Sequence, residues 1–218
     1  TERSLKELGD KVDPADRGRI ESAISELKDA IKGEDKAKIE LKGKALGEAV
    51  QALLSCVTSG GKVLACGNGG AGAAAQYFAA TFLGRFERER PELAALALSA
   101  DASTLTALAD DYDFVQIFAK QVRALGQAGD VLLVLCASGG AANVLAAVQA
   151  AHQREMTVVA LTGQGGGALM GLLRETDVHI CVPHERLARI HEVHVLALHC
   201  ISDGVDTQLL GEPQETNP

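Results

Sequence analysis

The sequence predicts an α/β protein with a doubly wound, five-stranded parallel sheet, preceded by an N-terminal helical hairpin. After residue 60, short and nearly all-apolar segments alternate with helical stretches, which is typical of a parallel sheet covered on both faces. Small-residue loops follow three of these segments, at the strand ends where such sheets bind ligands. The 218 residues, 47% of them hydrophobic, suffice for one domain with a substantial core.

The charge and the cysteines exclude several classes of function. A formal net charge of −8 argues against a surface that holds nucleic acid directly. No apolar run is long enough to span a bilayer and the first residues do not form a signal peptide, so we expect a cytoplasmic protein without a membrane partner. The five cysteines are widely spaced without a CxxC pair, which indicates reduced core thiols.

The first part of the chain is rich in charged residues and predicts two helices. Asp13 is the expected N-cap and Pro14 the first residue of a helix that ends at Gly33. A second helix begins near Asp35 and continues towards Gly60. We therefore divide the chain into a helical segment over 1–48, an α/β domain over 49–210 and a flexible tail over 211–218.

The α/β domain alternates strands with helices. A helix without Gly or Pro is expected at 73–83, directly after the first strand and its glycines, and a long final helix at 185–210. The predicted strands are 62–66, 93–98, 130–136, 157–162 and 177–182.

The first glycine-rich loop is the leading candidate site. Gly67, Asn68, Gly69 and Gly70 join a buried strand to a helix, so backbone N–H groups and the helix N-terminus converge on one point. Glycine allows an anion to approach the backbone, which favours a phosphate or carboxylate ligand. A turn that binds nothing is the alternative for a single loop. Similar loops at 137–141 and 163–167 favour a ligand pocket.

Nine short motifs of the α/β domain point to a family: Gly67 to Gly70, Arg85-Phe86, Arg90-Pro91, 129–133, 137–140, 160–163, Val182-Pro183, Arg189-Ile190 and 192–194. They resemble the sugar isomerase (SIS) domain, in the branch that holds phosphoheptose isomerases and DnaA initiator-associating proteins. The resemblance implies a flavodoxin-like sheet, a homo-oligomer (dimer or tetramer) and phosphosugar binding. In the family, hydroxyl groups after the first and third strands hold the phosphate, whereas this chain has Ala71 and Ala141 there and keeps only Ser138.

The resemblance also implies which residues would bind the phosphosugar or a metal and which would transfer protons. We expect Gly139 and Asp101 to join the phosphosugar pocket with Ser138 and the first loop; helix capping is the equal alternative for Asp101. His199 matches the family's catalytic acid/base position, and His191 with His199 could ligate zinc, although no cofactor is the main expectation. Tyr77 and Thr81 stand where phosphoheptose isomerases place a histidine and a glutamate, so the usual carboxylate base is missing.

Residues 1–48 are similar to the helical lid of a DnaK-type chaperone, which suggests a fusion or a designed chimera. Because stretch 119–130 is especially like the initiator-associating proteins, we predict a protein of that type with a degenerate phosphosugar pocket, a DnaA-type initiator as a partner, and no enzymatic activity. The alternatives are a phosphoheptose isomerase acting on sedoheptulose 7-phosphate, or a structural chimera without activity.

Overall fold

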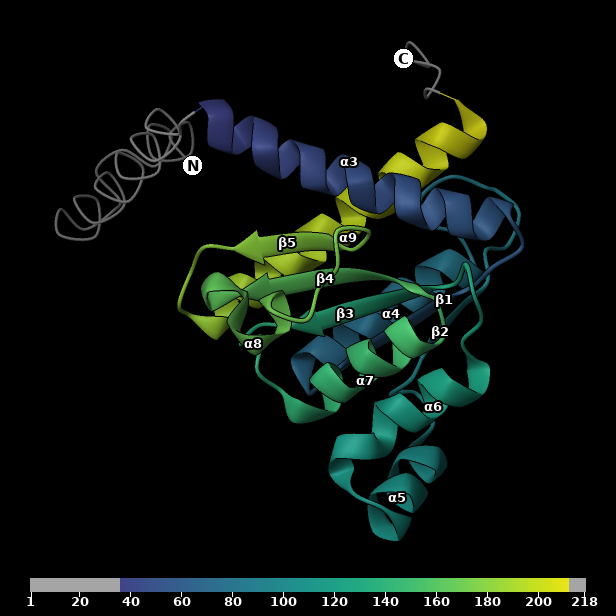
Figure 1. Ribbon diagram of the computed structural model, residues 1–218. Coiled ribbons are helices and arrows are strands. Elements are labelled where there is room, and N and C mark those ends of the chain that lie inside the picture. Colours follow the sequence, from purple (N-terminus) through teal and green to yellow (C-terminus); the bar gives the residue numbers. More distant parts are fainter. Residues whose placement is uncertain (1–35, 212–218) are drawn as a thin grey trace, which may run out of the picture. The chain divides into compact units, whose positions relative to one another are not determined.

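The computed structural model describes residues 36–211 and contains one five-stranded sheet in the order β2-β1-β3-β4-β5, with every neighbouring pair parallel (Figure 1). The predicted fold class is therefore confirmed. The chain divides into two units, Thr1–Gly43 and Lys44–Pro218, and the second is described below. The first predicted helix and the chaperone-like stretch before residue 36 lie outside the described residues, as does the tail after Gly211. The strands are β1 Val63–Gly67, β2 Ala95–Ala97, β3 Val131–Cys136, β4 Thr157–Gly163 and β5 Val178–Val182.

The helices follow the predicted alternation, with two shifted starts. α4 begins at Gly70 rather than at residue 73, because the glycine loop runs directly into the first turn and the N–H of Ala73 already donates to the carbonyl of Gly69 at 3.0 Å. The final helix begins at Leu187 rather than at residue 185. The helices are α3 Lys36–Thr58, α4 Gly70–Leu83, α5 Ala102–Asp111, α6 Ile117–Leu125, α7 Ala142–Gln153, α8 Gly167–Met170 and α9 Leu187–Leu210, with 3-10 turns at Phe114–Gln116 and Gln164–Gly166.

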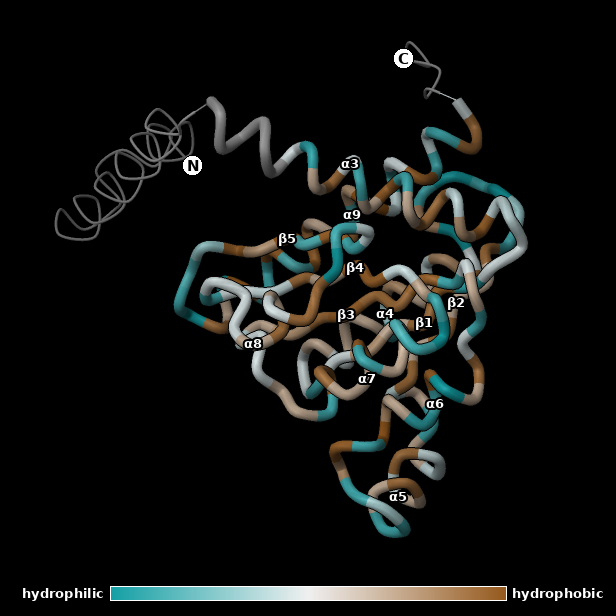
Figure 2. Tube along the Cα trace, viewed as in Figure 1, coloured by the Kyte–Doolittle hydropathy of each residue, from teal (hydrophilic) through white to brown (hydrophobic). Residues whose placement is uncertain are grey.

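The central strands β1, β3 and β4 are buried on both faces, and their alternate residues enter different cores. On one face Leu133 and its neighbours pack against α4, α9 and the second half of α3. On the other face Leu132 and Val134 pack against α6 and α7. Figure 2 shows the hydrophobic colouring that follows from this burial along the central strands. Because β3 lies in the centre and all of its residues are buried, its sequence is a continuous apolar run.

Asp130 links the amino ends of β1 and β3 through hydrogen bonds and an ion pair. Its carboxylate is almost fully buried and accepts hydrogen bonds from the Lys62 and Gln127 backbone N–H groups at 2.9 Å each. It also forms an ion pair with the Lys62 ammonium at 2.6 Å. The edge strand β2 is shorter than its predicted range of 93–98, since only Ala95–Ala97 pair with β1. Within residues 36–211, no helix is both long and apolar enough to cross a membrane.

Candidate functional site

The carboxyl ends of β1, β3 and β4 lie side by side and carry the three predicted glycine loops. In the first loop, Gly69 has φ +55° and forms the N-cap of α4 without a side-chain cap. A Cβ added at Gly67 would lie 2.8 Å from the backbone carbon of Ala71, so only glycine allows this approach between the strand and the first helical turn. The loop therefore presents the uncapped N-terminus of a fourteen-residue helix.

A cleft of about 340 Å³ opens beside this loop. Polar groups at its wall include Gln76, whose side-chain amide donates to the Ser99 carbonyl at 3.1 Å, and the amide of Asn68. The far wall comes from the segment between β2 and α6, where α5 itself has no buried residue. The cleft therefore lies between a helix N-terminus and a mostly apolar wall. Its lining residues are Gly67, Asn68, Gly69, Gly72, Ala73, Gln76, Ser99, Leu105, Phe114, Ile117 and Phe118.

The loop after β3 is tied to the first loop by a pair of side-chain amides. Asn68 and Asn143 exchange two hydrogen bonds, at 2.9 Å and 2.8 Å, and Asn143 is buried at the start of α7. Ser138 Oγ accepts from the Gly140 N–H at 3.3 Å, and Gly139 has φ +62°. Neither Ser138 nor Gly139 lines the cleft beside Asn68, so their part in a phosphosugar pocket stays a prediction.

Asp101 is the N-cap of α5. Its carboxylate accepts from the backbone N–H groups of Ser103 and Thr104 at 2.9 Å and 3.3 Å, and from the Thr104 hydroxyl at 2.6 Å. The Thr104 hydroxyl is the main reason why the pKa of Asp101 is lowered. The capping alternative therefore describes the contacts of Asp101, and its contact with a sugar hydroxyl stays a prediction.

Tyr77 and His199 meet where α4 faces α9. The phenol oxygen lies 3.0 Å from His199 Nε2, and the two rings are edge-on with centroids 5.6 Å apart. Phe86, from the segment after α4, lies on another side of the imidazole at 5.4 Å between centroids. Tyr77 remains 43% exposed, so this polar pair is accessible from solvent. Sequence reasoning placed His199 in the site but treated Tyr77 only as a departure from the family.

Thr81 lies one turn after Tyr77 on α4. Its hydroxyl donates to the Phe78 carbonyl at 2.8 Å, as hydroxyls in helices often do. A threonine hydroxyl is no carboxylate base, and this one is occupied by its own helix. Of the residues at this end of α4 and the facing part of α9, Tyr77 and His199 carry the side chains that can exchange a proton.

His191 lies elsewhere on α9. Its ring is 3.6 Å from the point where a Gly70 Cβ would stand, and 6.2 Å from the His194 ring centroid to centroid. The helix rise separates His191 from His199 by about 12 Å. Among the residues with described side chains, no three His, Cys, Asp or Glu groups could share a metal ion. Within one chain these two histidines therefore do not fit a common zinc site.

His194 is buried between β4 and α9. Its Nε2 lies 3.0 Å from the Thr162 carbonyl, and its Nδ1 has no partner among the described residues. The Thr162 hydroxyl lies 2.7 Å from His179 Nε2. Burial lowers the pKa of both His194 and His179, and nearby His191 adds to the effect on His194. Burial therefore favours the neutral form of both imidazoles.

Two features of the site escaped sequence reasoning. Arg90 and Asp206 form a buried ion pair between the end of α4 and α9, and the Asn143 side chain is hydrogen-bonded to Asn68 of the first loop. Arg90-Pro91 was visible as a motif, but nothing in its charged surroundings marked Arg90 as buried.

Comparisons with known proteins agree on the family. The model of the SIS domain matches residues 36–163. The chain is 65% identical to a phosphoheptose isomerase of Methylibium petroleiphilum over 177 residues, which cover 81% of this chain and 88% of the relative. It is 59% identical to that of an Azoarcus species, with 80% and 89% covered. The structure of phosphoheptose isomerase from Neisseria gonorrhoeae superposes with a TM-score of 0.75 at 45% identity, covering 86% of this chain and 98% of that one.

These matches correct the functional prediction. The expectation of an initiator-associating protein is wrong, because several relatives with 50–65% identity and two solved structures with 44–45% identity are phosphoheptose isomerases, which was the alternative expectation. The comparisons likewise give no support to a chaperone-lid chimera. This chain belongs to the SIS domain proteins, in the phosphoheptose isomerase family.

Proposed function

We propose that the protein is an aldose–ketose isomerase that converts sedoheptulose 7-phosphate into the corresponding aldoheptose 7-phosphate. The names of its relatives support the substrate. The observation that carries the proposal is the contact of 3.0 Å between the Tyr77 phenol and His199 Nε2, because it supplies an accessible proton-transfer pair in a chain that lacks the family's carboxylate.

The phosphate is assigned to the loop of Gly67 to Gly70. Loops of this kind hold phosphate with backbone N–H groups and the partial positive charge of the helix N-terminus. Ala71 supplies no hydroxyl, so affinity depends on the backbone and each missing hydrogen bond costs about 1 kcal/mol.

The sugar carbons are assigned to the Tyr77–His199 pair. The His199 imidazole takes a proton from C1 of the ketose and returns it to C2, while Tyr77 donates a hydrogen bond to the oxygen on C2. The hydroxyl proton of C1 passes through the phenol to that oxygen, so the reaction is an isomerisation without gain or loss of atoms. General acid–base steps of this kind contribute about 10²–10⁴-fold in rate.

Solvent exchange tests the proposal directly. The protein is incubated with sedoheptulose 7-phosphate in D₂O, with and without added zinc, and NMR follows both the aldose product and deuterium at C1 and C2. We expect product with incorporated deuterium, and a loss of roughly 10²-fold or more in His199→Asn and Tyr77→Phe. His184→Ala, an exposed histidine outside the pair, is the control and should be as active as the unmodified protein. Binding without product or exchange in both arms would refute the isomerase.

We also propose a homo-oligomer, a dimer or tetramer, on the basis of the family resemblance. Light scattering coupled to size-exclusion chromatography distinguishes these states, and a monomer at micromolar concentration would contradict it.

A further inference from the structure

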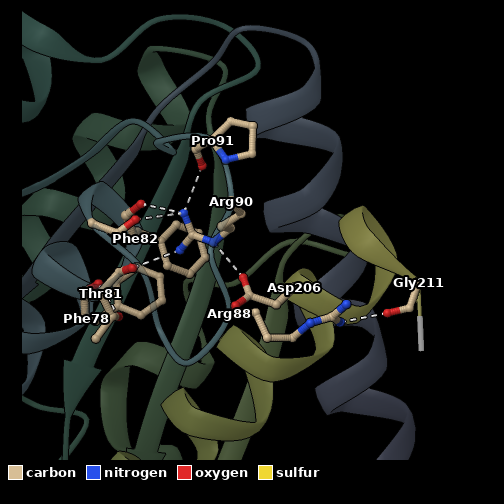
Figure 3. Close-up of polar contacts among 9 residues, drawn as sticks. Phe78, Thr81, Phe82, Arg88, Arg90, Pro91, Asp206 and Gly211 are labelled. Atoms are coloured by element: carbon tan, nitrogen blue, oxygen red, sulfur yellow. Dashed lines mark hydrogen bonds and ion pairs between the residues drawn. The ribbon is translucent and has the colours of Figure 1, made fainter. Parts of the chain in front are cut away.

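A buried ion pair connects the end of α4 to α9, farther along both helices than the Tyr77–His199 contact. Arg90 is 0% exposed and Asp206, on α9, is 2% exposed, with Arg90 Nε and Asp206 Oδ1 2.6 Å apart (Figure 3). The guanidinium also lies 5.7 Å from the centroid of the Phe82 ring. No step of the proposed reaction uses either residue.

The remaining N–H groups of Arg90 donate hydrogen bonds at the end of α4. Nη2 donates to the Thr81 carbonyl at 2.8 Å, and Nη1 donates to the Phe82 carbonyl at 3.0 Å. Nη1 is shared with the carbonyls of Gly84 and Pro91 at 3.4 Å and 3.1 Å. Thr81 and Phe82 belong to the last turn of α4, whose carbonyls have no partner within the helix. Arg90 therefore caps α4 with a positive charge and joins that cap to α9.

The two attachments between α4 and α9 lie on matching faces. Thr81 follows Tyr77 by about one helical turn, and Asp206 follows His199 by about two turns, so each pair shares one side of its helix. Besides the apolar core that both helices share, the Tyr77–His199 hydrogen bond is a polar attachment at one point. A second attachment farther along both helices fixes their register.

Buried ion pairs are a poor source of stability, because well-packed apolar residues of similar volume often replace them without loss. A buried arginine with all three nitrogens engaged is better explained by the geometry it imposes. We propose that Arg90 and Asp206 are positioning residues that hold Tyr77 and His199 within hydrogen-bond distance; the catalytic meaning of this inference rests on the proposed isomerase function.

The double variant Arg90→Met/Asp206→Leu distinguishes a role in positioning Tyr77 and His199 from a role in stabilising the fold. It removes both charges and replaces them with apolar side chains of similar shape. We expect it to melt cooperatively, with kcat lowered about 10²-fold, the loss typical of a displacement of about 1 Å in an active site. KM should change little, since the phosphate loop is at the other end of α4. Arg88→Gln is the matched control: Arg88 comes from the same segment and donates to the Gly211 carbonyl at 2.7 Å, but lies outside the buried pair. It should leave kcat unchanged.

Nitrogen-15 NMR of His199 gives a readout that does not depend on activity. The Tyr77→Phe variant gives the chemical shift of His199 Nε2 when the hydrogen bond to the phenol is absent. The double variant should show the same chemical shift. Asp206→Ala removes the acceptor of Arg90 Nε and should also reproduce the Tyr77→Phe signal, which covers the case in which the double variant does not fold. A folded double variant, or a folded Asp206→Ala, with unchanged kcat and an unchanged Nε2 signal would overturn the inference. An inactive unmodified protein would instead refute the isomerase, while the NMR comparison would still decide the positioning role.

Discussion

Replacing Asn143 by Asp probes the brace beneath the phosphate loop without a change of shape. Asn143 donates to Asn68 Oδ1 at 2.8 Å and accepts from Asn68 Nδ2 at 2.9 Å, and only 2% of the residue is exposed. In Asn143→Asp the accepting oxygen remains, but the donor becomes a second oxygen that faces Asn68 Oδ1. One hydrogen bond is lost and a charge is buried beside an acceptor.

The cost can be estimated from those contacts. The lost hydrogen bond contributes about 1 kcal/mol, and an uncompensated buried charge costs several kcal/mol. The N-terminus of α7 offsets up to about 1 kcal/mol, since it favours an anion. We therefore expect Asn143→Asp to lower the free energy of unfolding by roughly 3–4 kcal/mol at pH 8.

The pH dependence identifies the mechanism. Burial raises the pKa of the introduced carboxyl above its unfolded value of about 3.9, so stability falls as pH rises from there through the folded pKa, by at most about 1.4 kcal/mol per pH unit. At pH 5 the protonated carboxyl can donate to Asn68 again. Urea denaturation at pH 5 and pH 8 measures the difference, with Asn143→Ala as a control whose loss should not depend on pH. An equal loss at both pH values for Asn143→Asp would refute the amide pairing.

Three further predictions follow from other contacts. Because burial lowers the pKa of His179 and His194, the native state binds fewer protons than the unfolded chain, so stability is complete above about pH 6.5 and falls below it, by at most about 1.4 kcal/mol per pH unit for each histidine. Urea melts from pH 7.5 to 5 should show this slope, and His194→Gln should reduce it; equal slopes would contradict the assignment. Asp130→Ala leaves two backbone N–H groups and the Lys62 ammonium without their acceptor, so chemical denaturation should show a loss of about 3 kcal/mol, against almost none for the exposed Asp111→Ala. Gly67→Ala places a Cβ 2.8 Å from the Ala71 backbone and should abolish any rise in melting temperature with phosphosugar, whereas Gly47→Ala, with nothing within 4 Å, should retain it.

The sheet and its loops could be predicted because their signals are local. Val131 to Leu135 is a continuous apolar run, which only a strand buried on both faces requires. Gly67 and Gly69 likewise mark a strand that turns directly into a helix. In a parallel sheet the loops that follow neighbouring strands lie at the same edge. The sequence alone was therefore enough to predict that the three candidate loops lie close together.

The polar brace of the site could not be predicted. Arg90 comes from a segment, 85–90, with four other charged residues and bonds to Asp206, 116 residues away. Such a segment is typical of a solvated surface, and burial of one arginine depends on tertiary packing. Asp101 shows a different limit of the sequence. A carboxylate at this position can cap a helix or contact a sugar, and the sequence does not distinguish the two roles.

The functional prediction was wrong because it gave more importance to a few substituted site positions than to the similarity of the rest of the domain to phosphoheptose isomerases. Ala71 and Thr81 remove a hydroxyl and a carboxylate, and both losses were interpreted as loss of activity. The structure places Tyr77 and His199 in contact instead, and a phenol–imidazole pair is an alternative source of proton transfer.

The phosphate site proposed for Gly67 to Gly70, in which backbone N–H groups bind the ligand, has a consequence for which substitutions the loop tolerates. Its shape is fixed by close approach at Gly67 and by the backbone conformation of Gly69 rather than by the chemistry of side chains. Exchange of a neighbouring hydroxyl, as at Ala71, then tunes affinity in small steps, while any side chain larger than hydrogen at Gly67 blocks the loop at once. A library of variants scored for phosphosugar retention should therefore show a sharp boundary at Gly67 and a graded response at Ala71.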